Sequence, residues 1–351
     1  MKLIIPCAGR SSRYPDMPPK WSLPDHEGVP MIVRAVQELN FAPEDVVVTV
    51  LGIHEEQFSV SKGLAEAFGH PVRTVILEEQ TKSQSETVVE TLRRAKITEP
   101  FLVKDSDNSF KIDGIQASTN YVTVASLNDF DMINPRNKSY VNVDHEGFIT
   151  SIREKRVISD QFSVGGYYFR SPEAFIRAYE KLCDSNEFAA SEIYISEVIS
   201  YLMLNGEQFK TKLARNYQDW GTVHEWRRKL ESRKLFFVSI DGFLFERGSA
   251  IFSPRFDEVK PNLEAIASTQ ELAKNGHQLI YLSIRPQEME AMTRAALDSN
   301  GLPEARLIME CDLAQWTLVT SPHASLPYVT SRARELSPDD QNILEKLIGT
   351  H

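Results

Sequence analysis

Hydrophobic residues in the first two thirds of the chain form short β-type runs that alternate with stretches of helical periodicity. The expected strands are residues 3–6, 46–51, 73–77, 101–103, 121–126, 140–143, 148–152 and 162–170. The expected helices are residues 31–40, 55–67, 85–95, 172–183 and 191–204, with a charged helix at 223–233. This order predicts an α/β fold, a doubly wound mixed and mostly parallel sheet covered by helices.

A second, shorter alternation follows the charged helix. Strands are expected at 235–240, 279–283, 306–309 and 317–319, and helices at 262–275, 286–299 and 338–348. The pattern predicts two domains, a larger one over residues 1–232 and a smaller α/β domain over residues 233–351.

Composition narrows the class of protein. Of the 351 residues, 42% are hydrophobic and 25% charged, as in ordinary globular proteins. The net charge of −10 argues against a nucleic-acid partner, and no apolar run has the length of a membrane span. The N-terminal apolar stretch is too short for a signal peptide, and the three cysteines have no metal-ligand spacing, so we expect a cytoplasmic protein with free thiols. The oligomeric state, including a homo-oligomer, stays open.

The first expected strand runs directly into a loop of small and cationic residues, PCAGRSSR, and a PPK segment follows whose Lys20 is seven residues after Arg13. Backbone N–H groups of such a turn can point at phosphate oxygens. A nearby arginine and lysine, Arg13 and Lys20, can neutralise the charge of a triphosphate. An ordinary polar loop with solvated cations explains the same residues.

Two aspartates, Asp105 and Asp107, follow the expected strand 101–103. Ligands in open α/β sheets bind beyond the carboxyl ends of strands, and magnesium takes one or two carboxylates together with phosphate oxygens and water. The segment therefore suits a Mg²⁺ site, although local sequence alone favours an Asx-rich turn, which is common after strands.

These segments together resemble the sugar-phosphate nucleotidyltransferase family, including glucose-1-phosphate thymidylyltransferases. PCAGRSSR…PPK is similar to its nucleotide loop, SDN at 106–108 to its G-D-x element, and DWGT at 219–222 to its late D-x-G-T element. The resemblance implies Mg²⁺ held by Asp107 and Asp219, with Asp105 as the competing assignment to Asp107.

The same resemblance implies roles for the nucleotide-side residues. Arg13 would bind the triphosphate, and Lys20 would bridge the α-phosphate or the incoming phosphate. The remaining nucleotide contacts would come from Ala8, Gly9, Ser11, Gln80 and Asp107. Side chains at residues 10–12 depart from the glycines of many members, and SET at 85–87 departs from the family's G-T-A, so the base is not determined.

The acceptor side rests on an E-K pair before a glycine-containing strand. By resemblance, Lys155 would hold the acceptor phosphate, Glu154 a hydroxyl, and the backbone of Gly165 and Gly166 the acceptor ring. From the residues alone, Glu-Lys pairs are common on surfaces, and glycines in a strand often mark a bulge.

The second domain resembles haloacid-dehalogenase-type phosphatases around FFVSIDG at 236–242. Ser239 stands at the nucleophile position and lacks the charge of an aspartate, so we expect a degenerate domain without hydrolytic activity.

These observations predict a Mg²⁺-dependent nucleotidyltransferase that makes an NDP-linked product and pyrophosphate from an NTP and a sugar 1-phosphate, for surface polysaccharide. The nearest alternative is a CTP-dependent cytidylyltransferase acting on a non-sugar phosphorylated metabolite. A non-catalytic nucleotide-sugar sensor, and a phosphatase acting through the second domain, are alternatives of other classes.

Overall fold

A computed structural model gives the structure of the protein. It describes residues 1–9, 14, 17–130, 135–185, 192–246, 259–312, 317, 319, 336 and 342–348. The chain divides into two compact units, Met1–Trp226 and Arg227–His351, and the division falls inside helix α7 (Val223–Glu231).

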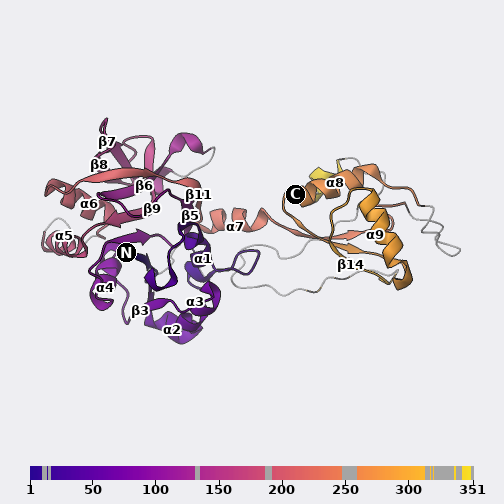
Figure 1. Ribbon diagram of the computed structural model, residues 1–351, viewed down its shortest axis with the longest axis horizontal. Helices are drawn as coiled ribbons and strands as arrows, with labels where there is room; N and C mark the ends of the chain where they lie inside the picture. The colour runs from indigo at the N-terminus through magenta and orange to yellow at the C-terminus, as the bar shows by residue number, and fades with distance from the viewer. Residues whose placement is uncertain are drawn as a thin grey trace. The chain divides into compact units, whose positions relative to one another are not determined.

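The first unit is built on one large mixed sheet (Figure 1). Its strands are β1 (Lys2–Pro6), β2 (Val46–Leu51), β3 (Arg73–Leu77), β4 (Phe101–Lys104), β6 (Asn120–Ser126), β7 (Ser139–Val143), β8 (Ile149–Glu154), β9 (Gln161–Phe169) and β10 (Phe209–Leu213). The order along the sheet is β10-β6-β9-β4-β1-β2-β3, and β7 and β8 join through β9. All pairs from β4 to β3 are parallel, whereas β9 runs antiparallel to its three partners β4, β6 and β7. The expected doubly wound, mostly parallel sheet is confirmed in this unit.

Two further strands form a small antiparallel ribbon, β5 (Asn108–Lys111) with β11 (Arg215–Asp219). The helices of the unit are α1 (Met31–Val36), α2 (Gly52–Phe58), α3 (Val60–Phe68), α4 (Gln84–Arg94), α5 (Pro172–Asp184) and α6 (Ile195–Leu204). Short 3-10 turns lie at η1 (Lys20–Ser22), η2 (Gln37–Leu39), η3 (Pro43–Asp45), η4 (Leu127–Asp129) and η5 (Pro135–Asn137).

Local sequence explains the strongest elements. Every residue of β2, VVVTVL, is buried, as expected for a strand of a parallel sheet that is covered on both faces. Helix α4 begins where the Ser83 hydroxyl accepts the N–H of Glu86 at 3.1 Å, and α5 begins with Pro172 directly after the capping residue Ser171.

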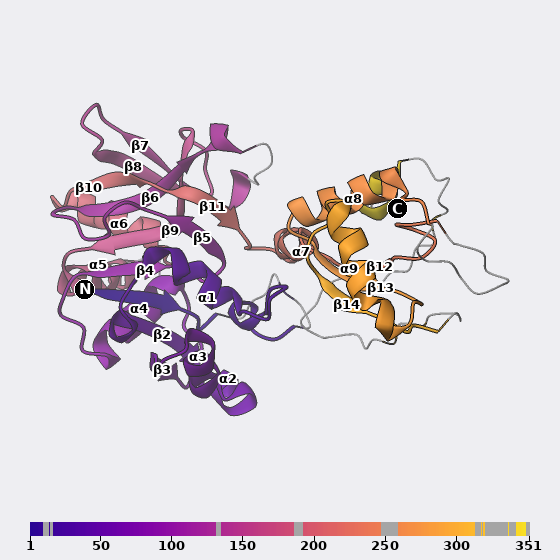
Figure 2. The ribbon, with the colours of Figure 1, turned by 45° about the vertical axis from the view of Figure 1, so that its right-hand side comes forward.

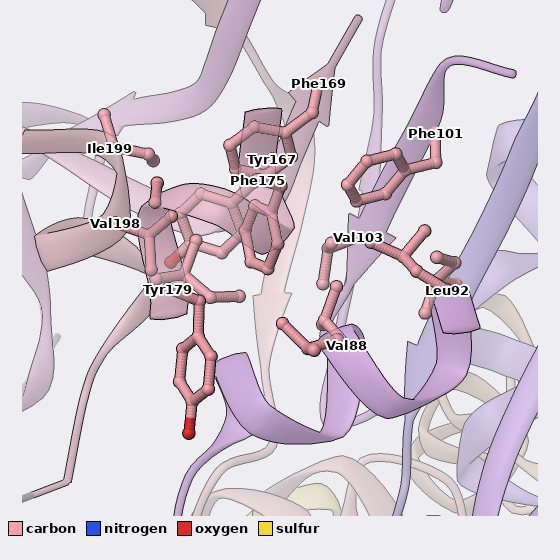
Figure 3. Packing of buried hydrophobic residues seen from close by; sticks show 14 of the residues in the cluster. Val88, Leu92, Phe101, Val103, Tyr167, Phe169, Phe175, Tyr179, Val198 and Ile199 are labelled. Carbon is pink, nitrogen blue, oxygen red and sulfur yellow. The ribbon is translucent and has the colours of Figure 1, made fainter. Parts of the chain in front are cut away.

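The main core lies between the sheet and helices α4, α5 and α6 (Figure 3). Phe101 stacks on Phe169 with ring centroids 5.2 Å apart, and Phe175 of α5 meets the edge of both rings. Val88 and Leu92 bring α4 into the same cluster. This packing fixes β4 and β9 against each other, and the carboxyl end of β4 carries the candidate site.

The second unit has a parallel sheet in the order β12-β13-β14, and Figure 2 shows these strands with their helices. Its elements are β12 (Leu235–Ser239), α8 (Leu263–Lys274), β13 (Gln278–Leu282), η6 (Gln287–Met289), α9 (Glu290–Ser299), β14 (Arg306–Ile308) and α10 (Ile343–Ile348). The expected strand at 317–319 is not formed at Thr317 or Val319, and residue 318 lies outside the described residues. None of the described helices, in either unit, has the length and apolar character that a membrane span requires.

Candidate functional site

The topology of the first unit brings two sequence segments to one edge of the sheet. Strand β1 has parallel neighbours on both sides, β2 on one and β4 on the other. After β1 the chain forms β2 and β3 on one side of β1, and it then crosses through α4 to form β4 on the other side. The direction in which strands are added to the sheet therefore reverses at β1. The loop after β1, with Ala8 and Gly9, and the turn after β4, with Asp105 and Asp107, leave the same edge. Such a switch point is where open α/β sheets bind ligands.

The β5–β11 ribbon brings the two predicted metal ligands together. Asp219 is the register partner of Asn108, the residue after Asp107. In addition, the Trp220 N–H donates to the Asp107 carbonyl oxygen at 2.8 Å. The two carboxylates therefore belong to directly paired backbone segments, although they are far apart in the chain.

The residues around Asp219 also make hydrogen bonds that stabilise the local backbone. The Asp219 Oδ1 accepts the Gly221 N–H at 3.1 Å, and Thr222 exchanges capping hydrogen bonds with Glu225 at the start of α7. The hydroxyl of Tyr14, from the loop after β1, donates to the carbonyl oxygens of Trp220 at 2.5 Å and Thr222 at 2.9 Å. The nucleotide-side loop is thus tied to the segment that carries Asp219.

Each of these carboxylates pairs with a lysine. Lys20 Nζ lies 2.5 Å from Asp107 Oδ2. Lys138 Nζ forms an ion pair with Asp219 Oδ2 and donates to the Tyr217 hydroxyl at 2.8 Å. Lys20 is a predicted site residue, and sequence reasoning missed Lys138, a lysine in a polar loop before β7.

A third lysine, Lys104, is completely buried at the end of β4. Its ammonium donates to the carbonyl oxygens of Asp105 at 2.6 Å and Asn108 at 2.8 Å, and to Asn108 Oδ1 at 2.5 Å. These bonds hold the turn that carries Asp107. Burial lowers the pKa of Lys104 to about 8, against the attraction of the nearby aspartates 105, 107 and 219. The one available signal was a lysine directly after the apolar run FLV.

Asp105 serves as a half-buried structural acceptor in the same turn. Its Oδ1 accepts from Gln84 Nε2 of α4 at 2.5 Å, and its backbone N–H donates to the Gly165 carbonyl oxygen at 2.9 Å. Burial, reinforced by the negative charge of Asp107, raises the pKa of Asp105 to about 6. Sequence reasoning did not single out Gln84 as the partner of this turn.

Both predicted glycines of β9 lie against this turn and its neighbours. Gly165 has φ +80°, and a Cβ there would lie 2.2 Å from Asp105 Oδ2. A Cβ on Gly166 would lie 2.3 Å from Thr123 Oγ1. Close approach of side chains to the β9 backbone therefore requires glycine at both positions.

The predicted acceptor pair lies at the end of β8. Glu154 Oε2 accepts from the hydroxyls of Ser139 and Ser196, the latter at 3.1 Å. Lys155 has φ 53°, and its Nζ donates to the Tyr194 hydroxyl at 2.7 Å, a bond that raises the pKa of Lys155. Its backbone N–H donates to the Lys138 carbonyl oxygen at 2.9 Å, so the two lysines start from neighbouring positions.

Of the remaining predicted nucleotide-side residues, the structure describes some and not others. Gln80 is exposed, in the loop between β3 and α4. Ser11 and Arg13 lie outside the described residues.

The donor set suits a hard cation. Among the described residues, no group of three or more His, Cys, Asp or Glu side chains is arranged to hold a metal ion by itself. Asp107 and Asp219 offer two carboxylates on paired backbone segments, and magnesium sites of this kind complete their coordination with phosphate oxygens and water. The residues present thus fit Mg²⁺ bound together with a phosphorylated ligand.

The second unit has a separate polar cluster at the carboxyl ends of β12 and β13. The buried carboxylate of Asp241 accepts from Arg285 Nε at 2.8 Å and from the Ser283 hydroxyl at 2.7 Å. The Ser239 hydroxyl donates to the Asp241 carbonyl oxygen at 3.1 Å. A buried guanidinium thus neutralises the aspartate.

Comparison with known proteins gives matches of structure. No family model and no curated protein sequence matches the chain. The fold is similar to that of a nucleoside-diphosphate-sugar pyrophosphorylase from Vibrio cholerae RC9, with TM-score 0.56 and 22% identity over 65% of this chain and 99% of that one.

Two further structures match over a similar share of the chain. An inositol-1-phosphate CTP transferase from T. maritima has TM-score 0.51 and 14% identity over 64% of this chain and 90% of its own. A UDP-glucose pyrophosphorylase complexed with UDP-glucose has TM-score 0.50 and 17% identity over 66% of this chain and 97% of its own. At these identities the likeness shows the fold, which this chain shares with nucleotidyltransferases.

Proposed function

We propose that the protein is a Mg²⁺-dependent nucleotidyltransferase that joins an NTP to a sugar 1-phosphate, releases pyrophosphate and supplies an NDP-sugar for surface polysaccharide. The observation that carries the proposal is the pairing of the Asp107 and Asp219 segments at the switch point, with Lys20 on one carboxylate and Lys138 on the other. Carboxylates flanked by cations at that edge suit a ligand with several phosphate groups.

The chemistry requires no side-chain nucleophile. An oxygen of the acceptor phosphate attacks the α-phosphorus of the NTP, and the bond from that phosphorus to the bridging oxygen of the β-phosphate breaks. Bound at Asp107 and Asp219, Mg²⁺ would neutralise charge on the phosphate oxygens. Lys20 and Arg13 would do the same on the nucleotide side, and the rest of catalysis is alignment of the two substrates.

On the acceptor side, Lys155 would hold the acceptor phosphate and Glu154 a hydroxyl of the sugar. Gly165 and Gly166 would present their backbone to the ring, while Ala8, Gly9, Ser11 and Gln80 would line the nucleotide. The three cysteines are free, which supports assignment of the reaction to the cytoplasm.

We further propose that the second unit is a degenerate haloacid-dehalogenase-like domain. The salt bridge between Asp241 and Arg285 supports this, because it occupies the carboxylate that such a phosphatase would use as an acid or base. The domain would bind a partner or support the first unit.

The test is a matrix of four NTPs against sugar 1-phosphates and non-sugar phosphates, in Mg²⁺, scored by product mass and pyrophosphate release. A sugar nucleotide from at least one pair is the expected result. A product from CTP and a phosphorylated amino alcohol alone would favour the cytidylyltransferase. If the protein binds nucleotide sugars but forms no product with any combination of NTP and acceptor, the enzymatic proposal is overturned in favour of a sensor.

A further inference from the structure

The lysines around the site differ in what their ammonium groups are free to do. Lys104 is buried, and its three N–H donors match three acceptors of the β4–β5 turn. It cannot reach a ligand without breaking that turn.

The ammonium of Lys155, assigned above to the acceptor phosphate, contacts Tyr194 in the structure. Besides its hydrogen bond to the Tyr194 hydroxyl, its Nζ lies 4.5 Å from the centre of the Tyr194 ring. The Tyr194 side chain thus holds this ammonium through two kinds of contact.

Lys138 instead points at the predicted metal ligand. Its side chain is 13% exposed, and its ammonium bridges Asp219 and the Tyr217 hydroxyl. The next residue, Ser139, is the register partner of Glu154 and donates to its carboxylate. Lys138 therefore stands between the carboxylates and the acceptor-side residues, whereas Lys20 approaches Asp107 from the segment after β1.

We propose that Lys138 is a phosphate-binding residue of the acceptor site, which contacts the phosphate group of the acceptor beside Asp219. This inference rests on the proposed function, and it adds a cation that the sequence resemblance does not include. A flexible four-carbon stem lets the ammonium move from a carboxylate oxygen to a phosphate oxygen next to it without backbone movement. In a partly desolvated position such a contact is stronger than on the open surface.

The test variant is Lys138→Gln, because an amide can still hydrogen-bond to Asp219 and Tyr217 while the positive charge is lost. Lys138→Arg keeps the charge. Lys210→Gln is the matched control, since Lys210 is an exposed lysine of β10 whose Nζ lies 4.2 Å from the Phe148 ring centre. Thermal unfolding of each variant checks that the fold is kept.

With an acceptor found in the matrix, we expect Lys138→Gln to raise the KM for the acceptor about tenfold or more and to leave the KM for the NTP within about twofold. Lys138→Arg should recover a large part of the loss, and Lys210→Gln should match the wild type. If Lys138 only tied the segment before β7 to β11, its replacement by glutamine would instead lower the stability of the fold, or change both KM values together. An unchanged acceptor KM in Lys138→Gln, with an active wild type, would overturn the inference and leave the proposed function standing.

A second readout does not depend on turnover. Line broadening of inorganic phosphate in ³¹P NMR, measured with the full chain, should be seen with the wild type and Lys210→Gln and be lost in Lys138→Gln. If this pattern is seen although the wild type makes no product, Lys138 is supported as a phosphate-binding residue and the proposed function is rejected. Equal broadening by all three proteins, or none by the wild type, would reject Lys138 as a phosphate-binding residue.

Discussion

The backbone N–H of Trp220 donates to the carbonyl oxygen of Asp107 at 2.8 Å. This bond joins the turn after β4 to the end of β11, so the backbone segments that carry Asp107 and Asp219 are paired. Main-chain geometry, rather than a flexible loop, thus establishes the position of both predicted metal ligands. Sites built on paired strands of this kind are held closely in place.

The close contact between Gly165 and the β4–β5 turn predicts a specific cost for a side chain. In Gly165→Ala, the Cβ would lie 2.2 Å from Asp105 Oδ2 and 2.7 Å from Asn108 Nδ2. Gly147 has the same φ of +80° with nothing within 4 Å, so Gly147→Ala reports the backbone strain alone. We expect Gly147→Ala to lower the free energy of unfolding by about 1–2 kcal/mol, and Gly165→Ala by about 1–3 kcal/mol more.

Denaturant unfolding of the two variants measures this difference. Equal losses of unfolding free energy in both variants would show that the contact between Gly165 and the β4–β5 turn adds no steric cost.

The raised pKa of Asp105 predicts a pH dependence of stability. The ordinary pKa of an aspartate is 3.8 and the pKa of Asp105 in the folded protein is about 6, so the native state binds more protons than the unfolded state between about pH 4 and 6. Stability contributed by this group is therefore present below about pH 4 and is lost as the pH rises through 6. Asp105→Asn removes the cost of the buried charge, and it should be more stable than the wild type at pH 7.5 by on the order of 2 kcal/mol, but not at pH 4.

Thermal unfolding at the two pH values tests this sign. Asp113→Asn is the control, because Asp113 is an exposed aspartate that pairs with the exposed Arg215. A gain for Asp105→Asn that is the same at both pH values would contradict the assignment.

The buried pair of the second unit predicts asymmetric effects of mutation. Arg285 and Asp241 have side chains that are 1% and 4% exposed. Arg285→Met leaves the carboxylate buried without this cation and should destabilise the unit by about 3–5 kcal/mol. The double variant Arg285→Met with Asp241→Asn should recover a large part of that loss in denaturant unfolding. A double variant that is as unstable as two independent losses would show that the pair is not coupled.

Much of the fold follows from local sequence, and the differences between the expected and the observed elements have physical causes. The boundaries of β2 and β3 match the expected ones, because β-branched runs with flanking polar residues are unambiguous. The helix expected at 55–67 is instead α2 and α3, which meet at Ser59 in a left-handed conformation. Strands β5, β10 and β11 were not expected, since sequences such as RNYQD show no apolar alternation. Pairing with a partner strand, rather than hydrophobic pattern, defines them.

The site was predictable to the extent that motifs mark it. Asp107 and Asp219 were expected to meet, and their segments are paired. Lys138 gave no signal, because its importance arises from a contact with Asp219 that only the folded chain creates. Arg13 and Ser11 lie outside the described residues, so their roles stay predictions.

In the proposed reaction, Asp107 and Asp219 together bind one divalent ion that activates a nucleoside triphosphate. Mg²⁺-dependent pyrophosphate release by Asp107→Asn and Asp219→Asn, with Asp113→Asn as control, tests this assignment. We expect each site variant to keep its fold and to lose activity by about a hundredfold or more, while the control stays within about twofold of the wild type. Retention of about half of the wild-type rate by either site variant would contradict it.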